Sequence, residues 1–405
     1  MSRRTLAIIG ASLAGAKAAE GAREAGFEGR VVLIGDEAHA PYERPPLSKD
    51  VLRGEKDAET VRVHPDGFYQ EHDIELVTDE VVALHTEGRR LELAAGEAVE
   101  FDTAVLATGA APRRLDIPGG DLGGVHLLRT LDDSLRLREA LRDGTRVVVI
   151  GAGWIGSEVA ASARQLGAEV VLVDPAPVPL QRVLGDEIGE VFRRLHADHG
   201  VTLRLGAGVE ALRGSGRVEE VVLADGRVER ADVVVVGIGV IPRTGLAEAA
   251  GLEVDNGIVV DEHLETAVPG IFAAGDVASA WHPHFRRQLR VEHWANALNQ
   301  GLVAGRNAAG AREVYDRLPY FFSDQYDLGM EYVGHGGSDH QVVVRGDVAA
   351  RELIAFWHRD GVVSAAMHMN VWDVVDDLKA IVGSGRSIDV ARLADPDVRL
   401  SELAS

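Results

Sequence analysis

The sequence predicts an α/β protein with two parallel-sheet domains and a smaller α+β domain at its C-terminal end. Two glycine-rich turns with the same plan lie 141 residues apart and read Gly10-Ala-Ser12-Leu-Ala-Gly15 and Gly151-Ala-Gly153-Trp-Ile-Gly156. Each turn follows an aliphatic strand, opens an alanine-containing helix, and leads to a second aliphatic strand. Near-continuous valine and isoleucine runs are typical of parallel strands covered on both faces. The chain is therefore expected to hold two Rossmann-like domains.

The first unit should run from the N-terminal strand to Asp36. We expect a helix over residues 14–25 that stops at Gly26, and then a buried strand over residues 31–34. Asp36 follows this strand at a spacing from the turn that suits a carboxylate binding a ribose. Ser12 stands where such turns usually have their second glycine, and it is small enough to be tolerated.

The second unit repeats this plan. A strand is expected over residues 146–150, a helix over residues 153–166 ending at Gly167, and a strand over residues 169–173 followed by Asp174. Glycines at such a turn let a pyrophosphate reach the amides at the helix N-terminus. Each turn thus predicts a dinucleotide site, and an enzyme with two dinucleotides usually passes electrons between them.

The bulk composition narrows the function. The chain of 405 residues fits two or three domains at roughly 150 residues each. Its 64 acidic against 42 basic side chains give a net charge of −22, which argues against nucleic-acid or anionic-membrane partners. No apolar run approaches the roughly 20 residues of a membrane span, and no signal peptide precedes the first strand. We expect a cytoplasmic protein.

The absence of cysteine excludes much redox chemistry. Without cysteine the chain has no redox-active dithiol, no thiolate metal site and no iron–sulfur cluster of its own. Two histidine pairs, His196 with His199 and His282 with His284, have spacings that can ligate a metal, but no third and fourth ligands are evident. No metal is therefore expected, and electrons should leave directly from a bound cofactor.

Further motifs follow in a specific order, and together they carry a resemblance. They are Tyr42-Glu-Arg44-Pro-Pro-Leu-Ser-Lys49, Ala107-Thr-Gly109, Leu128-Arg129-Thr130, Gly237-Ile-Gly239-Val-Ile-Pro242, Gly275-Asp276 and Trp294-Ala-Asn296. Over nearly its whole length the chain resembles the bacterial FAD-dependent NADH:ferredoxin reductases of the putidaredoxin reductase, rubredoxin reductase and dioxygenase-component type. The resemblance implies a glutathione-reductase-like fold in which the first glycine turn binds FAD and the second binds NADH.

The domain boundaries are expected in proline-bearing turns near Pro112 and Pro242. Residues 1–112 and 243–319 should form the FAD domain, residues 113–242 the NAD domain, and residues 320–405 a C-terminal interface domain. In the last domain we expect a strand over residues 341–345 and a hairpin over residues 352–369 that turns at Asp360-Gly361. A helix should follow, with Val371, Val374, Val375, Leu378 and Ile381 on one face and Gly383 as its stop.

The resemblance implies two catalytic residues. It places Lys49 beside the flavin ring, where a cation stabilises negative charge, and makes Glu158 its ion-pair partner. The alternatives are that Lys49 is an ordinary surface lysine and that Glu158 complements the dipole of its helix.

The resemblance also implies the cofactor ligands. Asp276 would bind the ribityl hydroxyls, Arg129 would hold FAD, Trp294 would pack on the pyrimidine side of the flavin, and Trp154 would gate the nicotinamide pocket. The alternatives are a turn-forming Asp276 and core packing for the two tryptophans. The full FAD set is Gly10, Ser12, Ala14, Gly15, Asp36, Arg44, Lys49, Val82, Ala107, Gly109, Arg129, Gly275, Asp276 and Trp294. The NADH set is Gly151, Gly153, Trp154, Ile155, Gly156, Asp174, Arg182 and Gly239.

The expected function is electron transfer from NADH through FAD to a small ferredoxin that feeds an oxygenase, by a monomer or weak dimer. A reductase of quinones or other small acceptors and an NADH sensor resembling apoptosis-inducing factor are the alternatives. Asp174 favours NADH over NADPH because it would repel a 2′-phosphate, and Arg182 is the nearest cation. For the transient ferredoxin contact we expect a cationic patch of Arg286, Arg287 and Arg290 with Lys379 and Arg386, unless these cations merely neutralise nearby acids.

Overall fold

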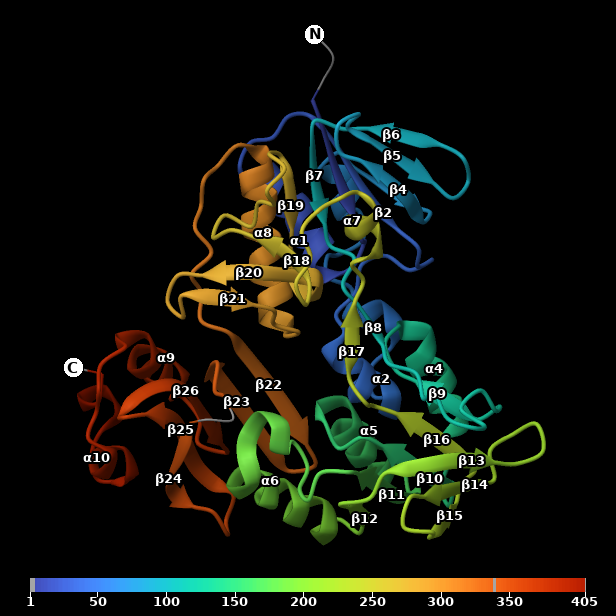
Figure 1. Ribbon diagram of the computed structural model, residues 1–405, viewed down its shortest axis with the longest axis vertical. Helices are drawn as coiled ribbons and strands as arrows, with labels where there is room; N and C mark the ends of the chain where they lie inside the picture. Colours follow the sequence, from blue (N-terminus) through green and yellow to red (C-terminus); the bar gives the residue numbers. More distant parts are fainter. Residues whose placement is uncertain (1–3, 338–339, 405) are drawn as a thin grey trace. The chain divides into compact units, whose positions relative to one another are not determined.

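The computed structural model describes residues 4–337 and 340–404, and the chain divides into two compact units (Figure 1). Unit 1 contains the chain up to Glu43 together with Glu59–Ala111 and Ile241–Pro319. Unit 2 contains Arg44–Ala58, Pro112–Val240 and the chain from Tyr320 onward. The chain crosses between the units in β8 (Ala110–Pro112) and β17 (Val240–Pro242), among other places. The assignment of three functional domains stays a prediction.

Unit 1 is built on a five-stranded parallel sheet in the order β19-β7-β1-β2-β3. Its strands are almost fully buried, apart from the edge strand β3, as their aliphatic sequences require. They are β1 (Thr5–Ile9), β2 (Arg30–Gly35), β3 (Ile74–Thr78), β7 (Thr103–Leu106) and β19 (Ile271–Ala273).

Helices α1 (Leu13–Glu24) and α8 (Trp294–Ala309) lie side by side in unit 1 (Figure 1). Their close approach depends on glycine, because a Cβ on Gly301 would lie 2.4 Å from the Ala14 carbonyl oxygen, and one on Gly305 would lie 1.9 Å from that of Ala18. The middle of α8 is thereby held against the first half of α1.

Two small sheets and short helices complete unit 1. One sheet is antiparallel and the other is mixed. The elements are α3 (Phe68–Glu71), β4 (Val81–His85), β5 (Arg90–Leu93), β6 (Ala98–Glu100), α7 (Gly245–Ala249), β18 (Ile258–Val260), the 3-10 turn η3 (Gly275–Val277), β20 (Ala278–His282) and β21 (Arg287–Leu289).

Unit 2 holds the second parallel sheet, in the order β12-β11-β10-β16-β9. Helix α6 bends at Gly185, which has a φ of 80°. The sheet strands are β9 (Val125–Leu127), β10 (Arg146–Ile150), β11 (Glu169–Asp174), β12 (Thr202–Leu205) and β16 (Val233–Val236), and the helices are η1 (Pro45–Ser48), α2 (Asp50–Arg53), α4 (Leu131–Ala140), α5 (Trp154–Gln165) and α6 (Gln181–Asp198). A three-stranded antiparallel sheet is added by β13 (Val209–Arg213), β14 (Glu220–Leu223) and β15 (Val228–Arg230).

The C-terminal part of unit 2 is a five-stranded antiparallel sheet in the order β22-β23-β26-β25-β24. Buried side chains of this sheet, such as Trp357 and Met330, form one hydrophobic cluster with Ile188 and Phe192 of α6. The elements are β22 (Tyr320–Gln325), β23 (Leu328–Gly334), β24 (Gln341–Asp347), β25 (Glu352–Arg359), β26 (Val362–Met369), α9 (Val375–Ser384) and α10 (Val390–Ala394).

The α/β fold class and the elements around both glycine turns are confirmed, with boundaries within one residue of those expected. The hairpin also turns at Asp360 and Gly361, both with positive φ. The expected stop of the last helix at Gly383 is wrong, because α9 continues to Ser384 and Gly385 takes the left-handed conformation that ends it. Strands β22 and β23 were not expected from the sequence. Within the described ranges, no helix combines the length and apolar composition needed to cross a bilayer.

Candidate active site

The first glycine turn follows β1 and is fixed by close backbone contacts. Gly10 has a φ of +113°, and a Cβ there would lie 2.2 Å from the carbonyl oxygen of Ala107. A Cβ on Gly15 would lie 1.9 Å from the carbonyl oxygen of Gly10. Ser12 is the N-cap of α1 with extended backbone. The turn therefore requires glycine at positions 10 and 15 and leaves the N-terminal amides of α1 at its mouth.

The segment that carries Asp276 lies against this turn within unit 1. Gly275 has a φ of +80°, and a Cβ there would come within 3.0 Å of the Ala14 Cβ. The Gly275 N–H donates to Gln300 Oε1 at 2.9 Å, which ties η3 to α8. Asp276 is thus brought to the start of α1, as a ligand of the same cofactor would be. Gln300 was not singled out in the sequence, because a glutamine within a helix carries no local signal of this role.

Trp294 is the first residue of α8 and is half-buried. Its Nε1–H donates to the carboxylate of Glu43, and burial raises the pKa of Glu43 while this hydrogen bond opposes the shift. Glu43 is a second residue that the sequence did not single out. The hydrogen bond fixes the plane of the indole. A fixed plane is compatible both with packing against the flavin and with packing in the core.

Three further predicted FAD ligands of unit 1 lie near the surface. The Asp36 carboxylate is 55% exposed at the end of β2, with its Oδ2 3.4 Å from the Nη1 of Arg243. Gly109 has a φ of 68°, and its carbonyl accepts from the Arg243 N–H at 2.9 Å. Val82 on β4 is 54% exposed. These residues are open to a ligand, and their role stays a prediction.

The second glycine turn, between β10 and α5, repeats the geometry of the first. Gly151 has a φ of +102°, and a Cβ there would lie 2.3 Å from the Gly237 carbonyl oxygen. A Cβ on Gly156 would lie 1.8 Å from the Gly151 carbonyl oxygen. A Cβ on Gly153 would meet nothing closer than the Gly237 oxygen at 4.0 Å. Packing thus demands two of the three glycines, and the open face of Gly153 suits the approach of a pyrophosphate.

Asp174 ends β11 beside this turn and makes two hydrogen bonds to the backbone. Its Oδ2 accepts from the Ala152 N–H at 2.6 Å, and its Oδ1 accepts from the Ala176 N–H at 2.8 Å. Arg182 lies in the first turn of α6, and Gly239 follows β16 with a φ of +94°. The predicted NADH ligands of this sheet therefore gather at the carboxyl ends of its strands, where α/β folds bind nucleotides.

Trp154 and Ile155 begin α5. The Trp154 ring packs edge-on against Phe192 and Phe321, with centroids 6.0 and 4.7 Å away. Ile155 is 43% exposed. The aromatic contacts give Trp154 a packing role, and its function as a gate over the nicotinamide stays a prediction.

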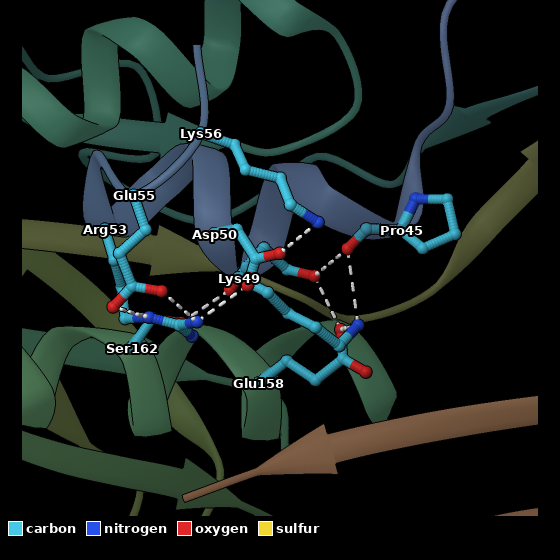
Figure 2. Close-up of polar contacts among 9 residues, drawn as sticks. Pro45, Lys49, Asp50, Arg53, Glu55, Lys56, Glu158 and Ser162 are labelled. Atoms are coloured by element: carbon cyan, nitrogen blue, oxygen red, sulfur yellow. Dashed lines mark hydrogen bonds and ion pairs between the residues drawn. The ribbon is translucent and has the colours of Figure 1, made fainter. Parts of the chain in front are cut away.

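Lys49 and Glu158 form a buried ion pair in unit 2, as the resemblance implied. Lys49 Nζ lies 2.7 Å from Glu158 Oε2, and the two side chains are 10% and 6% exposed. Lys49 Nζ also donates to the Pro45 carbonyl at 3.3 Å, as Figure 2 shows. The alternative of an ordinary surface lysine is wrong, because Lys49 is buried.

Two serine hydroxyls complete the surroundings of the Glu158 carboxylate. The Ser48 Oγ donates to Oε2 at 2.5 Å, and the Ser323 Oγ donates to Oε1 at 2.7 Å. Both serines are buried. Ser48 lies within a motif that was noted in the sequence, but only its neighbour Lys49 was given a role. Ser323 had no sequence signal, since it lies on β22, which was not expected.

The segment that carries Lys49 is anchored by two helices. The Ser134 Oγ of α4 donates to the Leu47 carbonyl at 2.7 Å, and the Ser162 Oγ of α5 donates to the Ser48 carbonyl at 2.7 Å. The guanidinium of Arg44 donates to the carbonyl of Arg129, which precedes the N-cap of α4. The predicted ligands Arg44, Lys49 and Arg129 therefore lie on one braced piece of unit 2.

A cavity of about 240 Å³ opens beside the ion pair. Lys49, Phe322 and Asp324 line it, together with the charged side chains of Asp50, Arg53 and Lys56 in and just after α2. In that group Asp50 accepts from Arg53 and lies 2.7 Å from Lys56 Nζ (Figure 2). Burial raises the pKa of Asp324, and the charge of Lys49 opposes the shift. Lys49 thus borders a cavity with a largely charged lining, whereas Glu158 does not line it.

The expected cationic docking patch needs one correction. Arg290 is only 11% exposed, lies 2.5 Å from Glu292 and donates to the Asp276 carbonyl at 3.3 Å. It braces η3 instead of presenting a docking charge. Arg287 is exposed on β21, and Lys379 lies 3.3 Å from Asp376. In the described part of the chain, no three or more His, Asp or Glu side chains are placed to hold a metal ion.

Comparisons with known proteins agree with this geometry. Residues 4–301 match the model of the pyridine nucleotide-disulphide oxidoreductase family, and residues 320–404 match the reductase C-terminal domain. The chain is 40% identical to the anthranilate 1,2-dioxygenase system ferredoxin–NAD(+) reductase component of Burkholderia cepacia, over 99% of both chains.

Two solved structures have nearly the same fold. The ferredoxin reductase for the CYP199A2 system from Rhodopseudomonas palustris is 40% identical, with a TM-score of 0.95 over 99% of this chain and 100% of that one. The reductase chain matched in the covalent putidaredoxin reductase–putidaredoxin complex is 34% identical, with a TM-score of 0.95 over 100% and 98% of the two chains. Matches of this extent show that the chain belongs to the pyridine nucleotide-disulphide oxidoreductase family and carries the C-terminal domain of its ferredoxin reductase branch.

Proposed function

We propose that this protein is an NADH-dependent flavoprotein reductase that passes electrons from NADH through FAD to a small iron–sulfur ferredoxin, which in turn feeds an oxygenase. One observation carries the proposal most directly. The chain has two glycine turns shaped for pyrophosphates but contains no cysteine. A disulfide relay, the chemistry in the family's name, is therefore impossible for this chain. Electrons must therefore leave directly from the bound flavin.

The two cofactors are assigned to the two turns. We assign FAD to Gly10, Ser12, Ala14 and Gly15 with Asp36 and Asp276, and NADH to Gly151, Gly153 and Gly156 with Asp174. When bound, FAD accepts two electrons as a hydride and can release them one at a time. The remaining predicted ligands, among them Arg44, Val82, Ala107, Gly109, Arg129, Trp294, Ile155, Arg182 and Gly239, are proposed to orient these two groups.

Lys49 and Glu158 have the catalytic role in this proposal. Lys49 supplies a fixed positive charge that stabilises the negative charge the flavin gains when it is reduced. Burial makes that charge effective, because a low-dielectric surrounding screens it weakly. Glu158 pairs with the Lys49 ammonium and holds its Nζ in place, which spares the site from reorganising during the reaction.

The partner and the compartment follow from the same reasoning. Of the relatives named above, one is the ferredoxin reductase component of a dioxygenase system, one is the ferredoxin reductase for the CYP199A2 system, and one was solved in a covalent complex with putidaredoxin. We propose a transient contact with a ferredoxin of this kind and a place of action in the cytoplasm.

Anaerobic titration of the purified protein with NADH tests the proposal. We expect a yellow protein that bleaches with one equivalent of NADH and recovers its colour when mixed with a suitable member of a ferredoxin panel. Turnover of quinones as fast as of every ferredoxin would favour a small-molecule reductase, and slow turnover of both would favour an NADH sensor. A colourless protein that binds no FAD would overturn the proposal.

A further inference from the structure

The carboxylate of Glu158 receives hydrogen bonds on both of its oxygens, from two distant parts of the chain. Lys49 Nζ lies 2.7 Å and Ser48 Oγ 2.5 Å from Oε2, while Ser323 Oγ lies 2.7 Å from Oε1. Ser323 belongs to β22, 165 residues beyond Glu158, and all four residues lie in unit 2. The first strand of the C-terminal sheet therefore contributes a polar group to the ion pair.

Burial makes the two serine hydroxyls energetically important. Glu158 is 5% exposed, and the two serines are 2% and 1% exposed, so water cannot replace a lost donor without rearrangement. An ionised carboxylate in such a place must have donors at both oxygens, because an unsatisfied buried charge is very costly. Oε2 has two donors, whereas Oε1 depends on Ser323 among the described residues.

The direction of the Ser323 hydrogen bond is also set by the structure. The buried Gln325 Nε2 donates to Ser323 Oγ at 3.3 Å, which leaves the hydroxyl hydrogen directed to Glu158. The backbone of Ser323 is paired with Met330 in the β22–β23 ladder, so its Cβ position is fixed by the sheet. The hydroxyl thus reaches Glu158 from a rigid element.

We propose that Ser323 is a positioning residue: with Ser48 it clamps the Glu158 carboxylate and so fixes the Nζ of Lys49. By this means the C-terminal sheet controls the charge that Lys49 presents to the flavin, in addition to any part it has in docking. The effect on the flavin rests on the proposed function, whereas the clamp itself does not.

The number of donors at each oxygen of Glu158 predicts which substitution should disturb the ion pair more. Ser323→Ala leaves Oε1 without a donor, and Ser48→Ala leaves Oε2 with Lys49. Ser323→Thr keeps the hydroxyl on a residue that strands accept. Ser364→Ala is the matched control, because the Ser364 hydroxyl in β26 of the same sheet donates at 3.3 Å to the Trp357 carbonyl and not to the ion pair.

The first experiment measures the ion pair without using activity. The full-length protein as purified is labelled with trace acetic anhydride, and its four lysines, Lys17, Lys49, Lys56 and Lys379, are resolved by peptide mass spectrometry. In Ser323→Ala we expect the labelling of Lys49 relative to Lys56 to rise by up to about tenfold, the factor that one lost hydrogen bond to a buried charge corresponds to. Ser48→Ala should give a smaller rise, and Ser323→Thr and Ser364→Ala should match the native protein. A ratio that stays the same in Ser323→Ala would overturn the proposal.

The second experiment is a double-mutant cycle on the flavin. Stopped-flow bleaching by NADH should slow in Ser323→Ala by roughly three- to tenfold, with the apparent dissociation constant for NADH unchanged. The flavin midpoint potential should shift with the rate. In the Glu158→Gln background, Ser323→Ala should change neither quantity further, because the clamp acts only through the carboxylate. Equal slowing in both backgrounds would reduce Ser323 to a general stabilising residue and refute the proposal.

The two experiments separate this proposal from the proposed function. If the protein carries no FAD, the function fails while the labelling ratio still decides whether the clamp exists. Should Ser323→Ala not fold, the comparison of Ser48→Ala with Ser323→Thr in the labelling experiment gives the answer. A Ser48→Ala ratio equal to that of Ser323→Thr would then contradict the clamp.

Discussion

The Asp174 carboxylate accepts a hydrogen bond of 2.6 Å from the N–H of Ala152, which joins the end of β11 to the glycine turn that it faces. Its second oxygen accepts from the Ala176 N–H at 2.8 Å. The residue expected to select the nucleotide is therefore also a brace of the turn that is expected to bind the pyrophosphate. A substitution at this position will change both the nucleotide preference and the geometry of the turn, unless it is chosen to separate the two effects.

NADH should be preferred over NADPH, because the charge of Asp174 repels a 2′-phosphate. Asp174→Asn keeps one oxygen that can accept from Ala152, loses the acceptor for the Ala176 N–H and removes the charge. It should narrow the preference for NADH over NADPH with a smaller loss of NADH efficiency than Asp174→Ala. Asp174→Ala also removes both hydrogen bonds to the turn. It should therefore narrow the preference for NADH over NADPH and also raise the KM for NADH. Steady-state kinetics with both nucleotides measures this. Equal efficiency of the native protein with NADH and NADPH would defeat the prediction.

Lys49→Met should slow flavin bleaching by NADH by roughly a hundredfold, the scale of losing one preorganised charged group at a reacting centre. FAD content should be largely preserved, and stopped-flow absorbance decides the matter. An unchanged bleaching rate would remove Lys49 from the mechanism.

The same change should lower the stability of the protein, since it leaves Glu158 buried without its ion-pair partner. Breaking a buried pair costs about 3 kcal/mol or more. The double variant Lys49→Met/Glu158→Gln should recover most of this loss in urea unfolding but none of the bleaching rate. Recovery of the rate would indicate that Lys49→Met acts through misfolding.

Stability should fall when the pH is lowered from about 6.5 to about 4, and His196 should contribute. Burial lowers the pKa of His196 to about 4, a shift that Gln325 opposes and His199 supports. The unfolded chain then binds a proton in this window that the folded chain refuses, so the free energy of unfolding decreases as the pH falls. The full effect of His196 is on the order of 3 kcal/mol. Urea unfolding should be measured at pH 7 and at pH 5. The free energy of unfolding should differ less between the two pH values for His196→Phe than for the native protein, and the same difference in both proteins would contradict the role given to His196.

Arginines of β21 and its surroundings should separate into docking and structural residues. Arg287→Glu should raise the KM for a ferredoxin by about fivefold, the upper range for one exposed charge pair, and leave the KM for NADH alone. The effect should shrink at high ionic strength. Arg290→Glu should instead lower FAD content, because Arg290 pairs with Glu292 and braces Asp276. A ferredoxin KM that Arg287→Glu does not move would place the docking surface elsewhere.

Local patterns allowed both glycine turns to be predicted from the sequence. At Gly10 and Gly151 the backbone itself demands glycine, and the flanking strands are continuous aliphatic runs, so the signal lies within a few residues. The pairing of Lys49 with Glu158 came from the resemblance, since 109 positions separate the two residues. Sequence spacing alone cannot place such a contact.

The failures have a common physical origin in tertiary contacts. Strand β22 carries Ser323, Asp324 and Gln325 in succession, and three polar residues in a row are typical of a loop. Only the folded structure shows that Glu158 is the partner of the buried Ser323 hydroxyl. Arg290 reads as a surface cation until Glu292 and the Asp276 carbonyl are seen beside it. Gly383 and Gly385 are equivalent as helix stops in sequence, and only the backbone shows that Gly385 takes the left-handed conformation.

The hydroxyl that Ser323 places on Glu158 also limits which C-terminal segments this chain could accept from a relative. A chimera that joins a foreign C-terminal segment at residue 320 would inherit a new surface together with a new group at Oε1 of Glu158. Exchange should be harmless where the grafted strand brings a serine or threonine to that register. A graft that brings an aliphatic residue should give a protein that folds and meets its new partner but accepts electrons slowly, until the single hydroxyl is restored.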